Sequence, residues 1–142
     1  MLLDNPADFA LLLDRLAVGA FFAISGYHKV FNPARHAALV EILKLDNIPC
    51  VRFNQWFVPW VELGAGSLLV VGFMSSRAAL LLGVICLVAT CMDGPKRVKE
   101  YKPLDAADWL DDILYLPEVL LGIMLVIVIL CGPGRHSLDF LM

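Results

Sequence analysis

Four long apolar stretches restrict the folds open to this chain. They run over residues 9–30, 56–74, 77–92 and 113–131. A helix needs about 20 mainly apolar residues to cross the hydrocarbon core of a bilayer. Hydrophobic residues make up 60% of the sequence, against about half in soluble domains. We therefore predict a single all-α domain over residues 1–142, an integral membrane four-helix bundle.

The connector after the first stretch carries the signals of a further helix. Asn32 is a suitable N-cap and Pro33 a suitable first helical residue. Apolar residues then recur at helical spacing with charged residues between them, which is typical of a helix lying on a membrane surface. We expect an interfacial helix over residues 33–46. Before the last stretch, Asp105 or Asp108 is placed to cap the final helix.

The basic residues predict the orientation of the chain. Eight Lys and Arg residues lie on the two long connectors and their edges, against three on the opposite side. An excess of Lys and Arg marks cytoplasmic loops, so both long connectors should be cytoplasmic and both termini outside. The eight are Lys29, Arg35, Lys44, Arg52, Lys96, Arg97, Lys99 and Lys102.

A short motif occurs twice. Pro59-Trp-Val-Glu-Leu-Gly64 and Pro117-Glu-Val-Leu-Leu-Gly122 share the pattern P-x-V-x-L-G. Two repeated helical hairpins of parallel topology would place it in the second helix of each. Chance matching among Leu and Val residues is the alternative.

Two glutamates, Glu62 and Glu118, lie inside apolar stretches. A charge in the membrane costs roughly 2.5–3.5 kcal/mol, so it is usually partnered and functional. Each lies about six residues from the cytoplasmic edge of its helix, some 9 Å deep at 1.5 Å per residue. The first stretch ends on this side, and we expect Lys29 to pair with a glutamate. The predicted polar layer, the candidate ligand site, consists of Tyr27, His28, Lys29, Glu62, Tyr115 and Glu118.

A second charged layer is predicted at the outer face. Its members are Asp14, Arg15, Arg77, Arg135 and Asp139. We expect Arg77 to pair with Asp14 or Asp139. For both layers, ion pairs that fix helix packing are one interpretation; binding a polar or quinone-like headgroup, or passing protons, is the other. The sequence identifies no catalytic residue, predicts no metal site, and its net charge of −3 gives no reason to expect nucleic acid.

Taken in order, several of these segments resemble the DoxX family. They are Arg15-Leu-Ala-Val-Gly with Ser-Gly-Tyr-His-Lys29, Glu62-Leu-Gly-Ala-Gly, Arg77, Pro-Glu118, and the closing Gly-Pro-Gly-Arg-His-Ser-Leu-Asp139. The resemblance implies a four-helix protein of the bacterial inner membrane. It also implies a link to redox processes: thiosulfate oxidation coupled to quinone, and membrane complexes that handle thiols and oxidative stress. The family's motif residues fall on Arg15, Gly26, Lys29, Glu62, Arg77, Glu118 and Asp139.

From this resemblance we expect a small membrane subunit, accessory to or part of a quinone-linked or thiol/sulfur redox complex. A direct part in catalysis would be that of a non-haem oxidoreductase subunit. No cofactor can be identified in the chain itself, and a quinone is the one that the resemblance suggests. Membrane lipid and other protein subunits are the expected partners. A small proton-coupled transporter and a purely structural membrane anchor are the alternatives.

Overall fold

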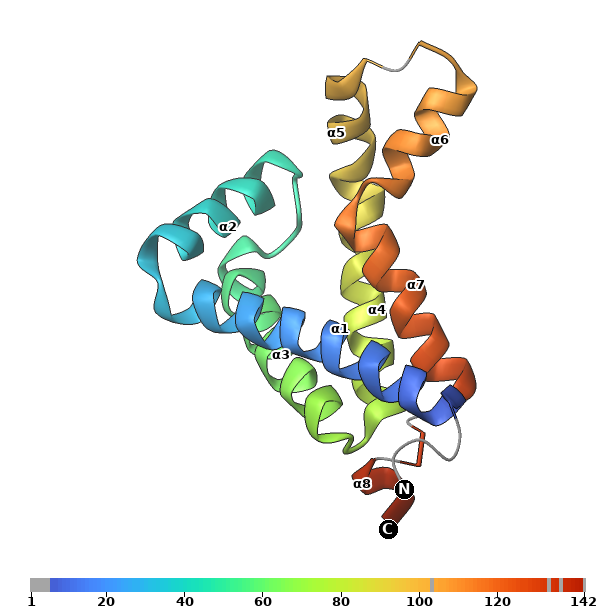
Figure 1. The fold of residues 1–142 in the computed structure, drawn as a ribbon. Coiled ribbons are helices and arrows are strands. Elements are labelled where there is room, and N and C mark those ends of the chain that lie inside the picture. Colours follow the sequence, from blue (N-terminus) through green and yellow to red (C-terminus); the bar gives the residue numbers. More distant parts are fainter. Residues whose placement is uncertain (1–5, 103, 133, 136, 142) are drawn as a thin grey trace.

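The computed structural model describes residues 6–102, 104–132, 134–135 and 137–141. For residues 140 and 141 it describes the backbone only. Within these residues the protein is all-α, as predicted, and has no strand (Figure 1). The helices are α1 (Pro6–Phe31), α2 (Pro33–Leu45), α3 (Val51–Val71), α4 (Ser75–Met92), α5 (Gly94–Tyr101), α6 (Ala106–Leu114), α7 (Pro117–Cys131) and α8 (Leu138–Leu141).

The first arm of the molecule consists of α1, α2 and α3. Helices α1 and α3 pack closely because glycines stand where they touch. A Cβ atom built on Gly26 would lie 2.4 Å from the backbone nitrogen of Leu63, and one on Gly66 would lie 2.5 Å from that of Ala23. Small residues at such positions let helix backbones approach each other in a membrane. Helix α2 packs on both α1 and α3.

The second arm consists of α4, α5, α6 and α7, in which α4 packs along α7. The two arms meet near the tight α3–α4 turn and diverge from there toward α2 and α5 (Figure 1). Gly72 ends α3 with φ +78°, a conformation that favours glycine. A core that includes Val18, Leu69, Leu82 and Leu125 fills the junction between the arms.

Among the residues that the structure describes, α1 and α4 are each long and apolar enough to cross a membrane, and α6 with α7 gives a third candidate if the pair is one bent span. The protein is therefore a helical membrane protein. Helix α3 has 21 residues, but its first turns carry the polar residues Arg52, Asn54 and Gln55. It is therefore not one of these candidate spans. The four-span bundle remains a prediction.

The predicted last span, residues 113–131, is wrong as one continuous helix. Helices α6 and α7 meet at a bend of 65°. Leu116 is extended, with φ −69° and ψ 122°, and Pro117 begins α7. Proline disfavours the helical conformation at the residue before it, so the helix breaks here although both flanks are apolar.

The predicted helix at residues 33–46 is confirmed as α2. The Asn32 side chain accepts hydrogen bonds from the backbone N–H groups of Ala34 and Arg35, at 3.0 and 3.4 Å. Asp105 caps α6 in the same way, so it caps a separate short helix and not the final one. Whether α2 lies at a membrane surface stays a prediction.

The repeat is not confirmed. The close pairs α1–α3 and α4–α7 are those that two hairpins would form. However, Pro59 lies inside α3 whereas Pro117 begins α7. The two P-x-V-x-L-G stretches therefore start at different points of their helices.

Candidate functional site

A cavity of about 770 Å³ lies between the two arms. Its walls come from α1, α2, α3, α4, α5 and α7, and they combine charged and apolar side chains. The polar lining residues are Ser25, Lys29, Arg35, Asp46, Asn54, Glu62, Asp93, Arg97 and Glu118. The predicted carboxylates thus face one shared space, together with cations.

On the first arm, Lys29 pairs with Glu62. The Nζ atom of Lys29 lies 2.8 and 2.7 Å from the two carboxylate oxygens, and the Ser25 hydroxyl donates to Oε2 at 3.2 Å. Glu62 is only 4% exposed. The close approach at Gly26 brings the last turns of α1 against α3 and so sets this pair. The pairing that we expected for Lys29 is present.

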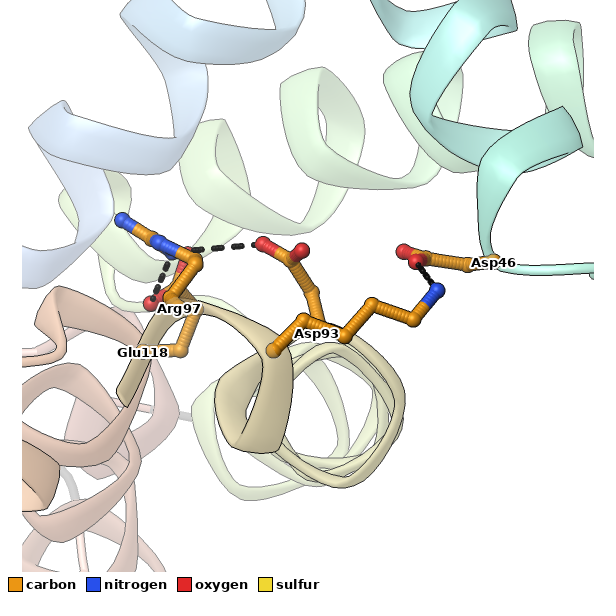
Figure 2. Close-up of polar contacts among 5 residues, drawn as sticks. Asp46, Asp93, Arg97 and Glu118 are labelled. Carbon is orange, nitrogen blue, oxygen red and sulfur yellow. Dashed lines mark hydrogen bonds and ion pairs between the residues drawn. The ribbon is translucent and has the colours of Figure 1, made fainter. Parts of the chain in front are cut away.

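On the second arm, Arg97 pairs with Glu118. The Nη1 atom of Arg97 lies 3.0 and 3.2 Å from the carboxylate oxygens of Glu118, and 3.5 Å from Oδ2 of Asp93 (Figure 2). Glu118 occupies the first turn of α7, where the helix dipole favours a negative charge. Sequence reasoning missed this partner of Glu118, because the i,i+4 spacing of Asp93 and Arg97 indicates only their own contact.

The surroundings alter the pKa values of this cluster. Burial raises the pKa of Asp93, and the nearby charge of Asp46 adds to the effect against the opposing Arg97. Burial disfavours the charged form of Arg97, but Glu118 and Asp93 outweigh it and raise its pKa. Arg97 therefore stays a cation, while Asp93 takes up a proton more readily than an ordinary aspartate.

A bridge joins the two arms beside the cavity. Lys96 of α5 donates to the carboxylate of Asp46 (Figure 2). It also donates to the backbone carbonyl of Leu45 at 3.0 Å. Asp46 directly follows α2 and its side chain is 5% exposed. Because α2 packs on α1 and α3, and α5 on α4 and α6, this bridge ties two elements that otherwise belong to separate arms.

The DoxX family model matches residues 10–93, which is more than half of the chain. The chain belongs to the DoxX family. The matched region contains Lys29 and Glu62, and Arg97, Glu118 and Asp139 lie beyond its end. A search of curated proteins and a search of solved structures each found no match.

Three members of the predicted polar layer lie outside the cavity of this DoxX protein. Tyr27 and Tyr115 are 53% and 75% exposed, and His28 is exposed as well. Tyr27 follows the inward-facing Gly26 by one residue, a rotation of about 100° around the helix, and its ring lies 4.8 Å from that of Phe31. Tyr115 sits in the break between α6 and α7. Of the six residues of the predicted polar layer, Lys29, Glu62 and Glu118 line the cavity.

The outer layer forms in part. The Asp139 carboxylate accepts hydrogen bonds from the N–H groups of Met74 and Ser75, at 2.6 and 2.7 Å, where α4 begins. Arg15 is 2% exposed and its charge acts on Asp139. The Nε atom of Arg135 lies 3.7 Å from Oδ2 of Asp8.

The pairing expected for Arg77 is wrong. Arg77 is exposed in the first turn of α4, and no ion pair joins it to another side chain in the part that the structure describes. Asp139 instead binds the backbone amides of that turn, because the four N–H groups at a helix start lack partners within the helix. Asp14 is half-buried in α1.

Proposed function

We propose that this protein is a small membrane subunit that binds a quinone-like headgroup for a redox complex. The observation that carries the proposal is one cavity holding an ion pair on each arm, Lys29 with Glu62 and Arg97 with Glu118. Its volume of about 770 Å³ falls within the ~300–1,000 Å³ of small-molecule sites.

The chemistry of these groups suits a neutral molecule with carbonyl oxygens. Each cavity glutamate has a cation beside it, so the charges largely offset one another. Lys29, Arg97 and the hydroxyl of Ser25 are hydrogen-bond donors for carbonyl oxygens. The carboxylates of Glu62 and Glu118 can accept hydrogen bonds from the hydroxyl groups of the reduced form, whose protons would come from water. The electrons would come from a partner subunit.

The position in the membrane follows from the charges. We place α2 and α5 on the cytoplasmic side of a bacterial inner membrane, with both termini outside, because the basic residues concentrate near these helices. In this orientation the ion pairs lie toward the cytoplasmic end of the cavity. Membrane lipid surrounds α1 and α4.

Quinone binding tests the proposal. Purified protein in nanodiscs is titrated with a tail-less dimethoxybenzoquinone while tryptophan fluorescence is followed. We expect Arg97→Gln and Glu62→Gln to raise the Kd at least tenfold, since each removes a charged group that faces the ligand. Lys99→Gln and Glu41→Gln change exposed residues of the same charges and should leave the Kd within twofold. Equal affinities in all four variants would contradict the proposal.

A proton-coupled transporter is the second candidate, favoured by one observation. Asp93, whose pKa is raised, lines the same cavity as the buried Glu62. A transporter predicts that Glu62→Gln abolishes proton-coupled flux in vesicles while the fold is kept. A purely structural anchor predicts neither quinone binding nor flux.

A further inference from the structure

Helix α6 has an apolar side and an acidic side, and none of the nine residues that the structure describes in it is buried. Successive residues of a helix are rotated by about 100°, which gathers the large apolar residues on one side and the aspartates on the other. The large apolar residues are Trp109, Leu110, Ile113 and Leu114. The aspartates are Asp108, Asp111 and Asp112. Because Trp109, Leu110 and Leu114 are 51%, 57% and 44% exposed, the apolar side is open to a partner outside this chain.

The end of α6 lies level with the end of a candidate span. Arg97 lies 3.5 Å from Asp93, which directly follows α4, and 3.0 Å from Glu118 in the first turn of α7. One guanidinium thus joins these two helix ends. The 18 residues of α4 extend about 27 Å at 1.5 Å per residue, close to the ~30 Å of the hydrocarbon core. Helix α6, which ends just before α7, therefore meets α7 at the boundary between hydrocarbon and headgroups.

The direction of α6 follows from its bend against α7. In Figure 1 the axis of α7 is inclined between the axes of the two candidate spans α1 and α4, so it gives the approximate direction across the bilayer. Helix α6 is bent by 65° from that axis, which leaves it inclined by about 25° to the membrane plane, a change in depth of only about 6 Å along its length. Amphipathic helices at membrane surfaces bury their apolar side to a depth of roughly 5–10 Å.

We propose that α6 is an in-plane amphipathic helix that rests on the lipid surface, on the side of the membrane where α2 and α5 lie. Its apolar side enters the boundary between headgroups and acyl chains, and its aspartates face water. Lipid fits better than a protein partner because the apolar side continues into α7, whose Leu120 and Ile123 are 51% and 49% exposed. Tryptophan, here Trp109, is also enriched at this level of a membrane.

The consequence concerns the candidate site. Helix α6 leads directly into Pro117 and Glu118, the first residues of α7. A helix held at the lipid surface fixes the depth of this start of α7, and with it the depth of the ion pair between Arg97 and Glu118. This role is independent of the ligand that the cavity binds.

Two neighbouring positions on α6 test the orientation of the helix. Leu110→Cys and Asp111→Cys are made in a cysteine-free variant, labelled with a nitroxide and reconstituted in lipid vesicles; both native residues are exposed. Collision of the label with oxygen, which concentrates in lipid, is compared with collision with a water-soluble nickel chelate. We expect the oxygen-to-nickel ratio to be at least threefold higher at Leu110 than at Asp111.

Each other result of this measurement overturns the proposal. Preference for nickel at both positions would mean that α6 stands in water. Preference for oxygen at both would mean that α6 continues the span of α7. A label at Leu110 that neither reagent reaches would mean that protein covers the apolar side.

The fluorescence of Trp109 gives an independent measure without a label. Trp56→Phe/Trp60→Phe leaves it as the one tryptophan of the three in the chain, and the vesicles contain lipids brominated either near the headgroup or near the chain end. We expect at least twofold stronger quenching by bromine near the headgroup. Leu110→Asp should reduce that quenching at least twofold, whereas the matched change Asp111→Asn should not. Unquenched Trp109, or stronger quenching by bromine at the chain end, contradicts the in-plane position.

Discussion

At the scale of residues, the site depends on how closely two backbones approach. Glu62 is 4% exposed, and both Lys29 and Ser25 donate hydrogen bonds to its carboxylate. These hydrogen bonds are possible because Gly26 has no side chain where α1 meets α3. A buried charge that loses its partner is strongly destabilising, so Gly26 indirectly stabilises the ion pair.

Gly26→Ala should therefore disturb both fold and site. Its Cβ would lie 2.4 Å from the nitrogen of Leu63 and 2.7 Å from the carbonyl oxygen of Pro59, and backbone atoms cannot move aside cheaply. We expect a loss of about 1–3 kcal/mol in the free energy of unfolding, measured by denaturant titration in mild detergent. Gly83→Ala is the control, because its added Cβ meets nothing within 4 Å. Equal stability of the two variants would count against the close packing.

At the scale of elements, helix ends were the most and the least predictable features. Asn32-Pro33 predicted the start of α2 because its capping chemistry is local. The break before Pro117 was missed because residues on both sides are apolar, and hydropathy alone sees one span. The pair of Arg97 with Glu118 was missed because Arg97 lies in a connector that was not expected to be helical. Depth in the membrane predicted that Lys29 pairs with a glutamate, and the structure identifies that glutamate as Glu62.

The start of α4 offers a test of a long-range cap. Asp139 lies far along the chain from Met74 and Ser75, whose backbone N–H groups donate hydrogen bonds to its carboxylate. Asp139→Asn should lower the free energy of unfolding by about 0.5–2 kcal/mol, in the range of other lost caps. Thermal unfolding followed by circular dichroism measures it, with Asp111→Asn, at an exposed position of α6, as a comparison.

The same carboxylate predicts a pH dependence. Burial opposes its ionisation, but the N–H groups of Ser75 and Met74 and the charge of Arg15 outweigh burial and hold the pKa of Asp139 below its ordinary value. A lowered pKa in the folded state means that this stabilisation is fully present above about pH 4 and is lost as the pH falls through the folded-state pKa. The difference between wild type and Asp139→Asn should shrink accordingly. A difference that grows at low pH would contradict the assignment.

At the scale of the whole molecule, two arms share a core at one end and a charged bridge at the other. The bridge of Lys96 to Asp46 should hold the arms together around the cavity. Cys86, 4% exposed, lines that cavity and reports its accessibility. The all-α membrane fold could be predicted from hydropathy, whereas the divergence of the arms could not, because it depends on tertiary contacts.

Lys96→Met should open the cavity to water. In a background with Ser at Cys50, Cys91 and Cys131, we expect a water-soluble maleimide to label Cys86 at least fivefold faster in Lys96→Met than in the wild type. Lys99→Met, a change at an exposed lysine of the same helix, should leave the rate unchanged. Equal rates in all three proteins would show that the bridge does not limit access.

The most direct measurement is the molecule that the protein retains. Wild-type protein and the paired variant Lys29→Leu/Glu62→Leu, which removes both charges at once and so leaves no unpaired ion in the membrane, are extracted gently and their bound small molecules identified by mass spectrometry. We predict near-stoichiometric quinone with the wild type and at least a tenfold loss in the folded variant. Lipid alone in both preparations, or equal quinone in both, would contradict the account.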